Sequence, residues 1–137
     1  MHDTIMQAAT TVVIDHFGRL NAAAGLNQPG FDALLSLVRS GKVYVKLSAA
    51  YRVSEAVDYA DLNPFAQALI EANPDRMVWG TDWPHPNHTH IPDDGCLVDA
   101  LTDIAPTPDQ MQQLLVDNPE RLYRFSEFKV NHKGQTP

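Results

Sequence analysis

The chain has 137 residues, 44% of them hydrophobic, which is enough for one domain with its own core and argues against intrinsic disorder. Acidic residues outnumber basic ones by 17 to 10, and the formal net charge of -7 comes without any cluster of lysine or arginine. A nucleic-acid partner is therefore not expected. Cys96 is the single cysteine, so a disulfide framework and a thiolate zinc cluster are excluded.

The N-terminal residues 1–7 lack the cationic start and apolar stretch of a secretory signal. No apolar segment approaches the roughly 18 residues that a membrane span requires. We therefore expect a cytoplasmic, reducing location and no membrane partner.

A first strand is predicted over residues 10–15, where β-branched and apolar residues run together before a loop that starts at His16. Residues 31–39 carry apolar side chains at helical spacing and predict a helix. Ser40 and Gly41 are expected to end this helix, because glycine is common just past a helix C-terminus.

A second strand is predicted over residues 42–48, and a second helix over residues 61–72. Asn63 is expected to cap this helix, with Pro64 in its first turn. The short apolar run of residues 77–79 predicts a third, buried strand, typical of a parallel sheet.

Helical patterns dominate the rest of the chain, after a polar loop over residues 86–94. Residues 95–104 predict a helix with four apolar residues on one face: Leu97, Val98, Leu101 and Ile104. Thr107 is expected to cap a following helix, whose apolar stripe is Met111, Leu114 and Leu115. Residues 118–125 predict a last short helix, and residues 131–137 a polar, frayed tail.

The order of strands and helices predicts an α/β fold with parallel strands joined by helical crossovers. Three strands leave two apolar sheet edges exposed. We therefore expect that the chain pairs with another copy through these edges, as a homo-oligomer, or is part of something larger.

Polar residues follow all three strands at the point where each ends, and parallel strands bring such loops to one side of a sheet. The pairs are His16 with Arg19, Tyr51 with Arg52, and Asp82 with His85. An imidazole, two guanidinium groups and a carboxylate suit an anionic substrate attacked by an activated water. The sequence therefore predicts a pocket for a carboxylated small molecule.

Structural alternatives remain open for these residues. His16 could be a satisfied buried histidine, and Asp82 a turn residue that accepts backbone N–H bonds. Arg52 could pair on the surface with Glu55 or Asp58. Tyr51 could line the pocket or cover the core, and His85 is the weakest candidate.

Four segments resemble the amidohydrolase family of TIM-barrel hydrolases, and within it the lactonases that handle dicarboxylates. They are residues 13–19 (VIDHFGR), 45–52 (VKLSAAYR), 79–86 (WGTDWPHP) and 118–125 (NPERLYRF). The likeness extends over residues 10–125, and the segment around Asp82 is its most specific part.

The resemblance implies a partial (β/α)8 TIM barrel, in which the three strands are equivalent to strands six to eight. Residues 1–125 would be the C-terminal part of such a barrel and residues 126–137 a polar tail. It also implies a hydrolase that opens a lactone or related ring of a carboxylated small molecule.

In such enzymes the aspartate of the last strand, here Asp82, is the general base for the hydrolytic water. By the same resemblance His16 would polarise the lactone carbonyl, and Arg19 and Arg52 would hold substrate carboxylates. Tyr51 and His85 complete the expected set as substrate-binding residues.

No cofactor is expected, although the resemblance leaves room for a divalent metal, because some members are metal-dependent. In those members the last-strand aspartate is also a metal ligand and His16 would approach the metal. His88 and His90 have the family's His-x-His spelling, but they follow the last strand, so no metal role is assigned to them.

Two other interpretations remain open. The first keeps the fold and makes the protein a metal-dependent decarboxylase or hydrolase of the same family. The second is a catalytically inert half-barrel that associates with itself through its exposed edges.

Overall fold

The computed structural model describes residues 2–89 and 91–125 of the chain. Its sheet has three parallel strands, β1 (Val12–Ile14), β2 (Val43–Ser48) and β3 (Met77–Gly80), in the order β1-β2-β3. These are the three strands predicted from the apolar runs. Their parallel order confirms the α/β prediction, and β1 and β3 form the two edges of an open sheet.

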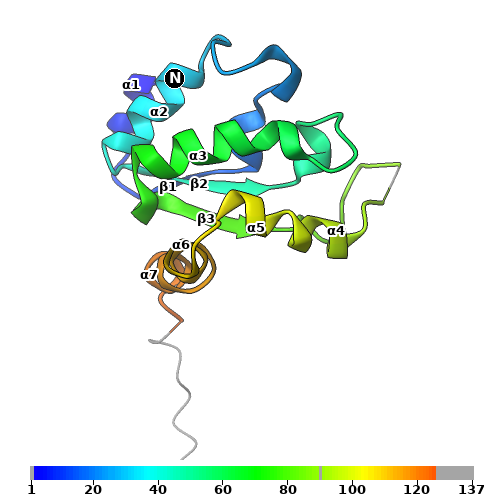
Figure 1. Ribbon diagram of the computed structural model, residues 1–137. Helices are drawn as coiled ribbons and strands as arrows, with labels where there is room; N and C mark the ends of the chain where they lie inside the picture. The colour runs from blue at the N-terminus through cyan, green and yellow to red at the C-terminus, as the bar shows by residue number, and fades with distance from the viewer. Residues whose placement is uncertain (1, 90, 126–137) are drawn as a thin grey trace, which may run out of the picture.

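Helices cover one face of this sheet. Figure 1 shows α2 and α3 lying over that face, while the column of helix from α6 to α7 lies beyond the edge strand β3, where Leu114 joins the same core beside Met77. The helices are α1 (His2–Met6), α2 (Phe31–Arg39), α3 (Asn63–Ala72), α4 (Asp94–Asp99), α5 (Leu101–Ile104), α6 (Pro108–Gln112) and α7 (Asn118–Tyr123). None of the helices in the described ranges is long and apolar enough to cross a membrane.

The side chains of β2 alternate between the two faces of the sheet, as they do in any strand. Val43, Val45 and Leu47 are fully buried in the main hydrophobic core, on the side of α2 and α3. The core also joins these two helices to each other, since the rings of Phe31 and Phe65 meet edge to face with centroids 5.2 Å apart. Burial of this apolar face is the main stabilising contribution to the fold.

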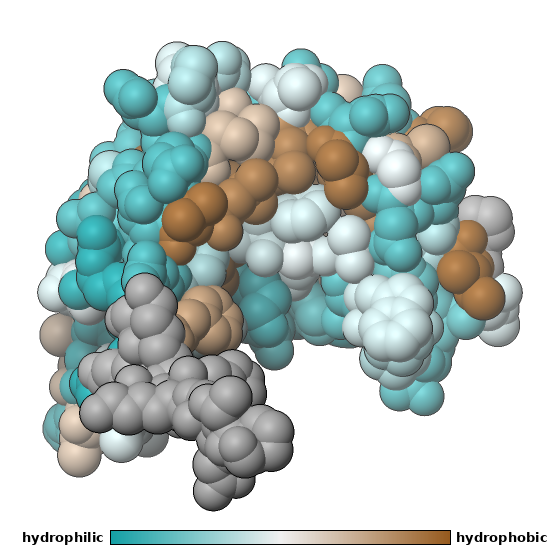
Figure 2. Space-filling view, turned by 90° about the horizontal axis from the view of Figure 1, so that it is seen from below, coloured by the Kyte–Doolittle hydropathy of each residue, from teal (hydrophilic) through white to brown (hydrophobic). Residues whose placement is uncertain are grey.

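The opposite face carries the polar set Tyr44, Lys46 and Ser48. Figure 2 views the molecule from that side, away from α2 and α3, and shows a hollowed face crossed by a band of hydrophobic surface. On the edge strand β1, Val13 keeps 36% of its surface exposed. The three-stranded sheet is therefore open, and its hollowed face, on the side away from α2 and α3, is its inner face.

Several details of the helices differ from the prediction. Asn63 does not cap α3, because a 3-10 turn (Ala60–Leu62) leads straight into the helix and makes Asn63 its first residue. The predicted helix is divided at Ala100 into α4 and α5, and Val98 is 48% exposed, whereas Leu97, Leu101 and Ile104 are buried as predicted. Leu115 is 39% exposed, because a π-helical segment (Gln113–Asp117) changes the phase between α6 and α7.

Other details are confirmed. Thr107 accepts a hydrogen bond from the backbone N–H of Gln110 and forms a full capping box. Gly41 follows α2 with φ 72°, a left-handed conformation that glycine adopts without strain. The short helix α1 was not predicted, and the expected tail of residues 131–137 lies outside the described residues.

Candidate active site at the carboxyl ends of the strands

Each of the three strands runs into a tight segment at its carboxyl end. After β1 comes a 3-10 turn (His16–Arg19), after β2 another (Ala50–Arg52), and after β3 the turn that contains Asp82. Asp82 has φ 78°, a left-handed conformation that is strained for a non-glycine residue. The surrounding contacts must therefore hold this carboxylate in place.

Two side chains from the β2 loop hold one carboxylate oxygen of Asp82. Tyr51 donates its hydroxyl hydrogen bond to Oδ2 over 2.7 Å, and Arg52 donates from Nε to the same oxygen over 3.0 Å. Arg52 also donates from Nη2 to the carbonyl oxygen of Pro86. Arg52 thus pairs with Asp82 across the strand ends and not with Glu55 or Asp58 on the surface.

The other oxygen, Oδ1, faces an imidazole. It lies 3.8 Å from Nε2 of His16, and the side chains of His16 and Asp82 are only 21% and 17% exposed. On its far side, Nδ1 of His16 lies 2.9 Å from Oγ of Ser48, the last residue of β2. The gap between Nε2 and Oδ1 is too long for a direct hydrogen bond, but one water or substrate oxygen can contact both atoms.

The electrostatics of the site favour an ionised carboxylate. Burial raises the pKa of Asp82, but the hydrogen bonds from Tyr51 and Arg52 and the charge of His16 outweigh it, and the net pKa is lowered. Burial, followed by the hydrogen bond to Asp82, raises the pKa of Tyr51. The hydrogen bond to Asp82 also raises the pKa of Arg52. Asp82 is therefore charged, and Tyr51 is a neutral donor, at neutral pH.

His85 lies behind Tyr51 and is 4% exposed. Its ring meets the Tyr51 ring edge to face, with centroids 5.3 Å apart, and Nε2 lies 3.3 Å from Oδ1 of Asp94. His88 contacts the Tyr51 ring in the same manner at 4.6 Å. Of the expected substrate-binding residues, His85 is thus the one that the fold buries.

Arg19 is separated from this cluster. It is exposed and lines a different cavity of about 300 Å3, between α1, α2 and the turn after β1. Most of the residues that line this cavity are apolar, among them Ile5, Ile14, Phe17, Leu20, Phe31, Leu34 and Leu37. The expected convergence holds for His16, Tyr51, Arg52 and Asp82, and does not include Arg19.

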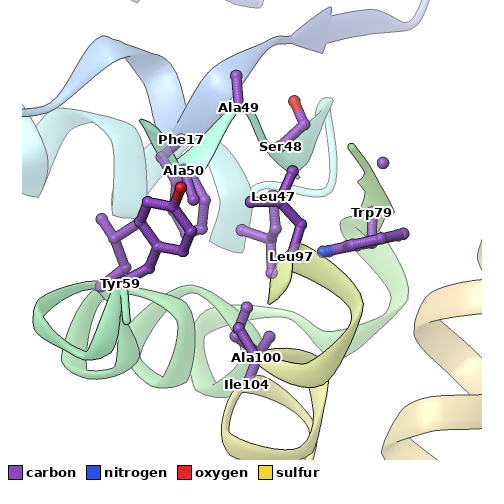
Figure 3. Close-up of a pocket in the computed structure, with 12 residues that line it drawn as sticks. Phe17, Leu47, Ser48, Ala49, Ala50, Tyr59, Trp79, Leu97, Ala100 and Ile104 are labelled. Carbon is purple, nitrogen blue, oxygen red and sulfur yellow. The ribbon is translucent and has the colours of Figure 1, made fainter. Parts of the chain in front are cut away.

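A second, much smaller cavity lies beneath the strand ends and has a volume of about 20 Å3. Figure 3 shows Leu97, Ala100 and Ile104, from the α4–α5 segment, pointing toward Leu47 of β2. The space is sufficient for one water but not for a substrate. It belongs to the packing that supports the site.

Two polar contacts near the site were not predicted. Ser48 contacts His16, and Lys46 forms an ion pair with Asp15, with Nζ 2.7 Å from Oδ1. The Asp15 hydrogen bond raises the pKa of Lys46. The side chains of β2 alternate between the two faces of the sheet, which places Lys46 and Ser48 on the inner face, beside the end of β1. This pattern could have predicted both contacts.

The described residues do not complete a metal site. Nε2 of His16 and Oδ1 of Asp82 are two candidate donors, whereas a protein-bound zinc ion takes three protein ligands or more. No group of three or more His, Cys, Asp or Glu side chains with metal-binding geometry occurs within residues 2–89 and 91–125. No step of the chemistry below is therefore assigned to a metal.

A parallel sheet whose carboxyl ends present a carboxylate, an imidazole and a guanidinium group has the arrangement found at the active end of (β/α)8-barrel enzymes. Residues 5–125 match the sequence profile of the amidohydrolase family. The chain therefore belongs to the amidohydrolase family.

Known relatives agree with this assignment. The chain is 46% identical over 125 residues to 2-pyrone-4,6-dicarboxylate hydrolase of Comamonas testosteroni, covering 83% of this chain and 41% of the relative. It is 41% identical over 125 residues to 4-sulfomuconolactone hydrolase of Hydrogenophaga intermedia, covering 88% and 41%. The chain thus spans about two fifths of the length of these curated relatives.

The fold agrees as well. A crystal structure of a candidate 2-pyrone-4,6-dicarboxylic acid hydrolase from Pseudomonas putida superposes with a TM-score of 0.76 at 37% identity. The match covers 85% of this chain and 44% of that chain. The three strands and their helices therefore have the architecture of part of an amidohydrolase barrel.

Proposed function

We propose that this chain carries the catalytic base of a hydrolase that opens a lactone, or a related ring, in a carboxylated small molecule. Support comes from its membership of the amidohydrolase family and from two relatives that are named as hydrolases of a pyrone dicarboxylate and a sulfomuconolactone. The substrate class follows from these names, because both describe a cyclic ester with acidic substituents.

The observation that carries this proposal is the asymmetry of the Asp82 carboxylate. Oδ2 is held by Tyr51 and Arg52, while Oδ1 faces Nε2 of His16 across 3.8 Å. A carboxylate fixed through one oxygen presents the other in a constant orientation, as a general base requires.

In the proposed reaction, Oδ1 of Asp82 accepts a proton from a water as the water oxygen attacks the ring carbonyl carbon. His16 donates a hydrogen bond from Nε2 to the carbonyl oxygen, where negative charge develops. Ser48 favours this role if its hydroxyl donates to Nδ1, because Nδ1 is then the acceptor and Nε2 carries the proton. The ring C–O bond breaks, and the departing ring oxygen takes the proton that Asp82 accepted from the water, which restores the carboxylate.

Arginine recognises the acidic substituents of the substrate. Arg52 is 14% exposed and has more N–H donors than its contacts with Asp82 and Pro86 use, so it binds one carboxylate while it holds the base. Arg19 has no part in this proposal, because it lies at the separate cavity beside α2, and Tyr51 contributes through its hydrogen bond to Asp82.

Replacing Asp82 with Asn tests the proposal, with 2-pyrone-4,6-dicarboxylate and 4-sulfomuconolactone as candidate substrates. We expect kcat to fall by about 1,000-fold, because Asn cannot accept the proton. Asp99→Asn is the matched control, since it makes the same change on the exposed surface of α4. Turnover retained in the folded Asp82→Asn protein would refute the assignment.

A second proposal concerns assembly. We assign residues 1–125 to one barrel-type unit and infer that its open edges β1 and β3, together with the hollowed inner face, promote pairing between copies. Sedimentation velocity of the purified protein tests this, and a monomer at all concentrations would contradict it.

A further inference from the structure

The ring of His85 packs against Tyr51, whose hydroxyl donates to Asp82. We propose that His85 and Asp94 form a positioning pair, which clamps the ring of Tyr51 and so fixes the orientation of the Asp82 carboxylate. This inference rests on the proposed role of Asp82, and it gives a different function to a residue that the sequence assigned to substrate binding.

Burial excludes direct contact between His85 and a substrate. Its side chain is 2% exposed, and within the described residues neither ring nitrogen makes a well-aligned hydrogen bond. The polar group nearest to Nε2 is the carboxylate of Asp94, at 3.3 Å, from the first residue of α4. The contact with Asp94 therefore connects the buried imidazole of His85 to helix α4, which lies outside the turns at the ends of the strands.

The pair reaches Asp82 by two routes. The imidazole of His85 packs edge to face on Tyr51, whose hydroxyl donates to Oδ2 of Asp82. The backbone N–H of His85 also donates to the carbonyl oxygen of Asp82 over 2.7 Å. Both routes converge on the residue that carries the proposed chemistry.

The backbone of this turn needs such support. Asp82, His85 and Asn87 all have left-handed φ values, between 58° and 78°, which cost free energy at non-glycine residues. Besides the His85–Asp94 contact, Arg52 holds the same turn through the carbonyl oxygen of Pro86. Without the Asp94 carboxylate, the turn loses this contact with α4, and Tyr51 gains freedom to rotate away.

Asp94→Asn is the informative variant, because it keeps the buried ring and removes its charged partner. The readout is the pKa of the Asp82 carboxyl, measured by NMR and assigned from the Asp82→Asn spectrum, so it is independent of turnover. Loss of a negative charge alone lowers that pKa, whereas a weakened hydrogen bond from Tyr51 raises it. The charged or titratable groups that act on Asp82 are Tyr51, Arg52, His16 and Lys46. Those that face His85 are Asp94 and Tyr51, and His88 also packs against the Tyr51 ring.

We expect Asp94→Asn to raise the pKa of Asp82 and to lower kcat by about 10-fold or more, with a smaller change in KM. His85→Ala should raise the same pKa, and Asp99→Asn, on the same helix, should not. An unchanged or lowered Asp82 pKa in folded Asp94→Asn would overturn the positioning role. If the pKa rises but no variant, nor the unmodified protein, hydrolyses lactones, the proposed function fails and the positioning pair stands.

Discussion

An arginine packs against a tyrosine at each end of the sheet, but the two arginines donate hydrogen bonds to different groups. At the carboxyl end, the Arg52 guanidinium lies 5.1 Å from the Tyr51 ring centroid, and both side chains donate to the Asp82 carboxylate. At the amino end, the Arg76 guanidinium lies 4.8 Å from the Tyr44 ring and donates to the Tyr44 hydroxyl.

The amino-end pair connects backbone. Arg76 donates from Nε to the carbonyl oxygen of Gly41 over 2.8 Å, which ties the start of β3 to the start of β2. Nearby, the fully buried Asn118 donates to the carbonyl oxygens of Pro74 and Met77, both over 2.7 Å. The same residue types thus stabilise the fold at one end and orient a carboxylate at the other, as expected for a barrel that separates stability from chemistry.

Among substitutions in these two arginine–tyrosine pairs, Arg52→Ala should give the largest effect, and it tests the carboxyl end. We expect kcat/KM to fall by about 100-fold or more, because Asp82 and a substrate carboxylate both lose a charged donor. Steady-state kinetics with a carboxylated lactone measure this. Arg52→Lys keeps the positive charge but lacks the planar guanidinium group. Its kcat/KM should therefore lie between the values of the unmodified protein and of Arg52→Ala. Full activity in Arg52→Ala would remove the arginine from the site.

Arg76→Ala should show the opposite pattern. The free energy of unfolding should fall by about 2 kcal/mol, since two hydrogen bonds from a charged group are lost. Urea unfolding measures this loss. The kcat of the folded enzyme should stay unchanged, and a large drop in kcat would contradict the separation of the two ends.

The tyrosines offer a finer comparison. Tyr51→Phe removes the hydroxyl that donates to Asp82, and we expect kcat to fall by about 10-fold, equal to the loss of one charge-assisted hydrogen bond. Tyr44→Phe removes an acceptor of Arg76 and should cost about 1 kcal/mol of stability without a change in kcat. Equal kinetic effects of the two substitutions would show that the hydroxyl of Tyr51 has no special role.

Acid should affect the two ends differently, and this is the smallest expected effect. The pKa of Asp82 in the folded protein lies below its ordinary value of 3.8, so the ionised carboxylate stabilises the fold above that value. This stabilisation is lost as the pH falls through the lowered pKa. The stability difference between the unmodified protein and Asp82→Asn should therefore shrink on acidification, whereas that for Arg76→Ala should change less. Chemical unfolding over a pH series measures both.

The sequence predicted the strands and the grouping at their ends for a physical reason. Short apolar runs define β1, β2 and β3, and parallel strands place the loops that follow them at one edge. His16, Tyr51, Arg52 and Asp82 were therefore found from the strand pattern, and the likeness to the amidohydrolase family added their roles.

Local backbone geometry set the limit of that prediction. The turn after β1 has four consecutive left-handed residues, from His16 to Arg19, with φ between 52° and 69°. This tight coil turns Arg19 toward the cavity beside α2, although only two residues separate it from His16. The contact between His85 and Asp94 could not be predicted from the sequence either. Asp94 begins a helix after a long polar loop, and no local sequence pattern connects the two residues.

The most direct test of the central claim is a crystal structure of the Asp82→Asn protein with a carboxylated lactone such as 2-pyrone-4,6-dicarboxylate bound, since the inactive variant should retain the intact ring. We expect the ring carbonyl to lie between residue 82 and Nε2 of His16, with a substrate carboxylate on Arg52. A lactone bound in the cavity beside α2, away from the strand ends, would contradict the assignment of the active site.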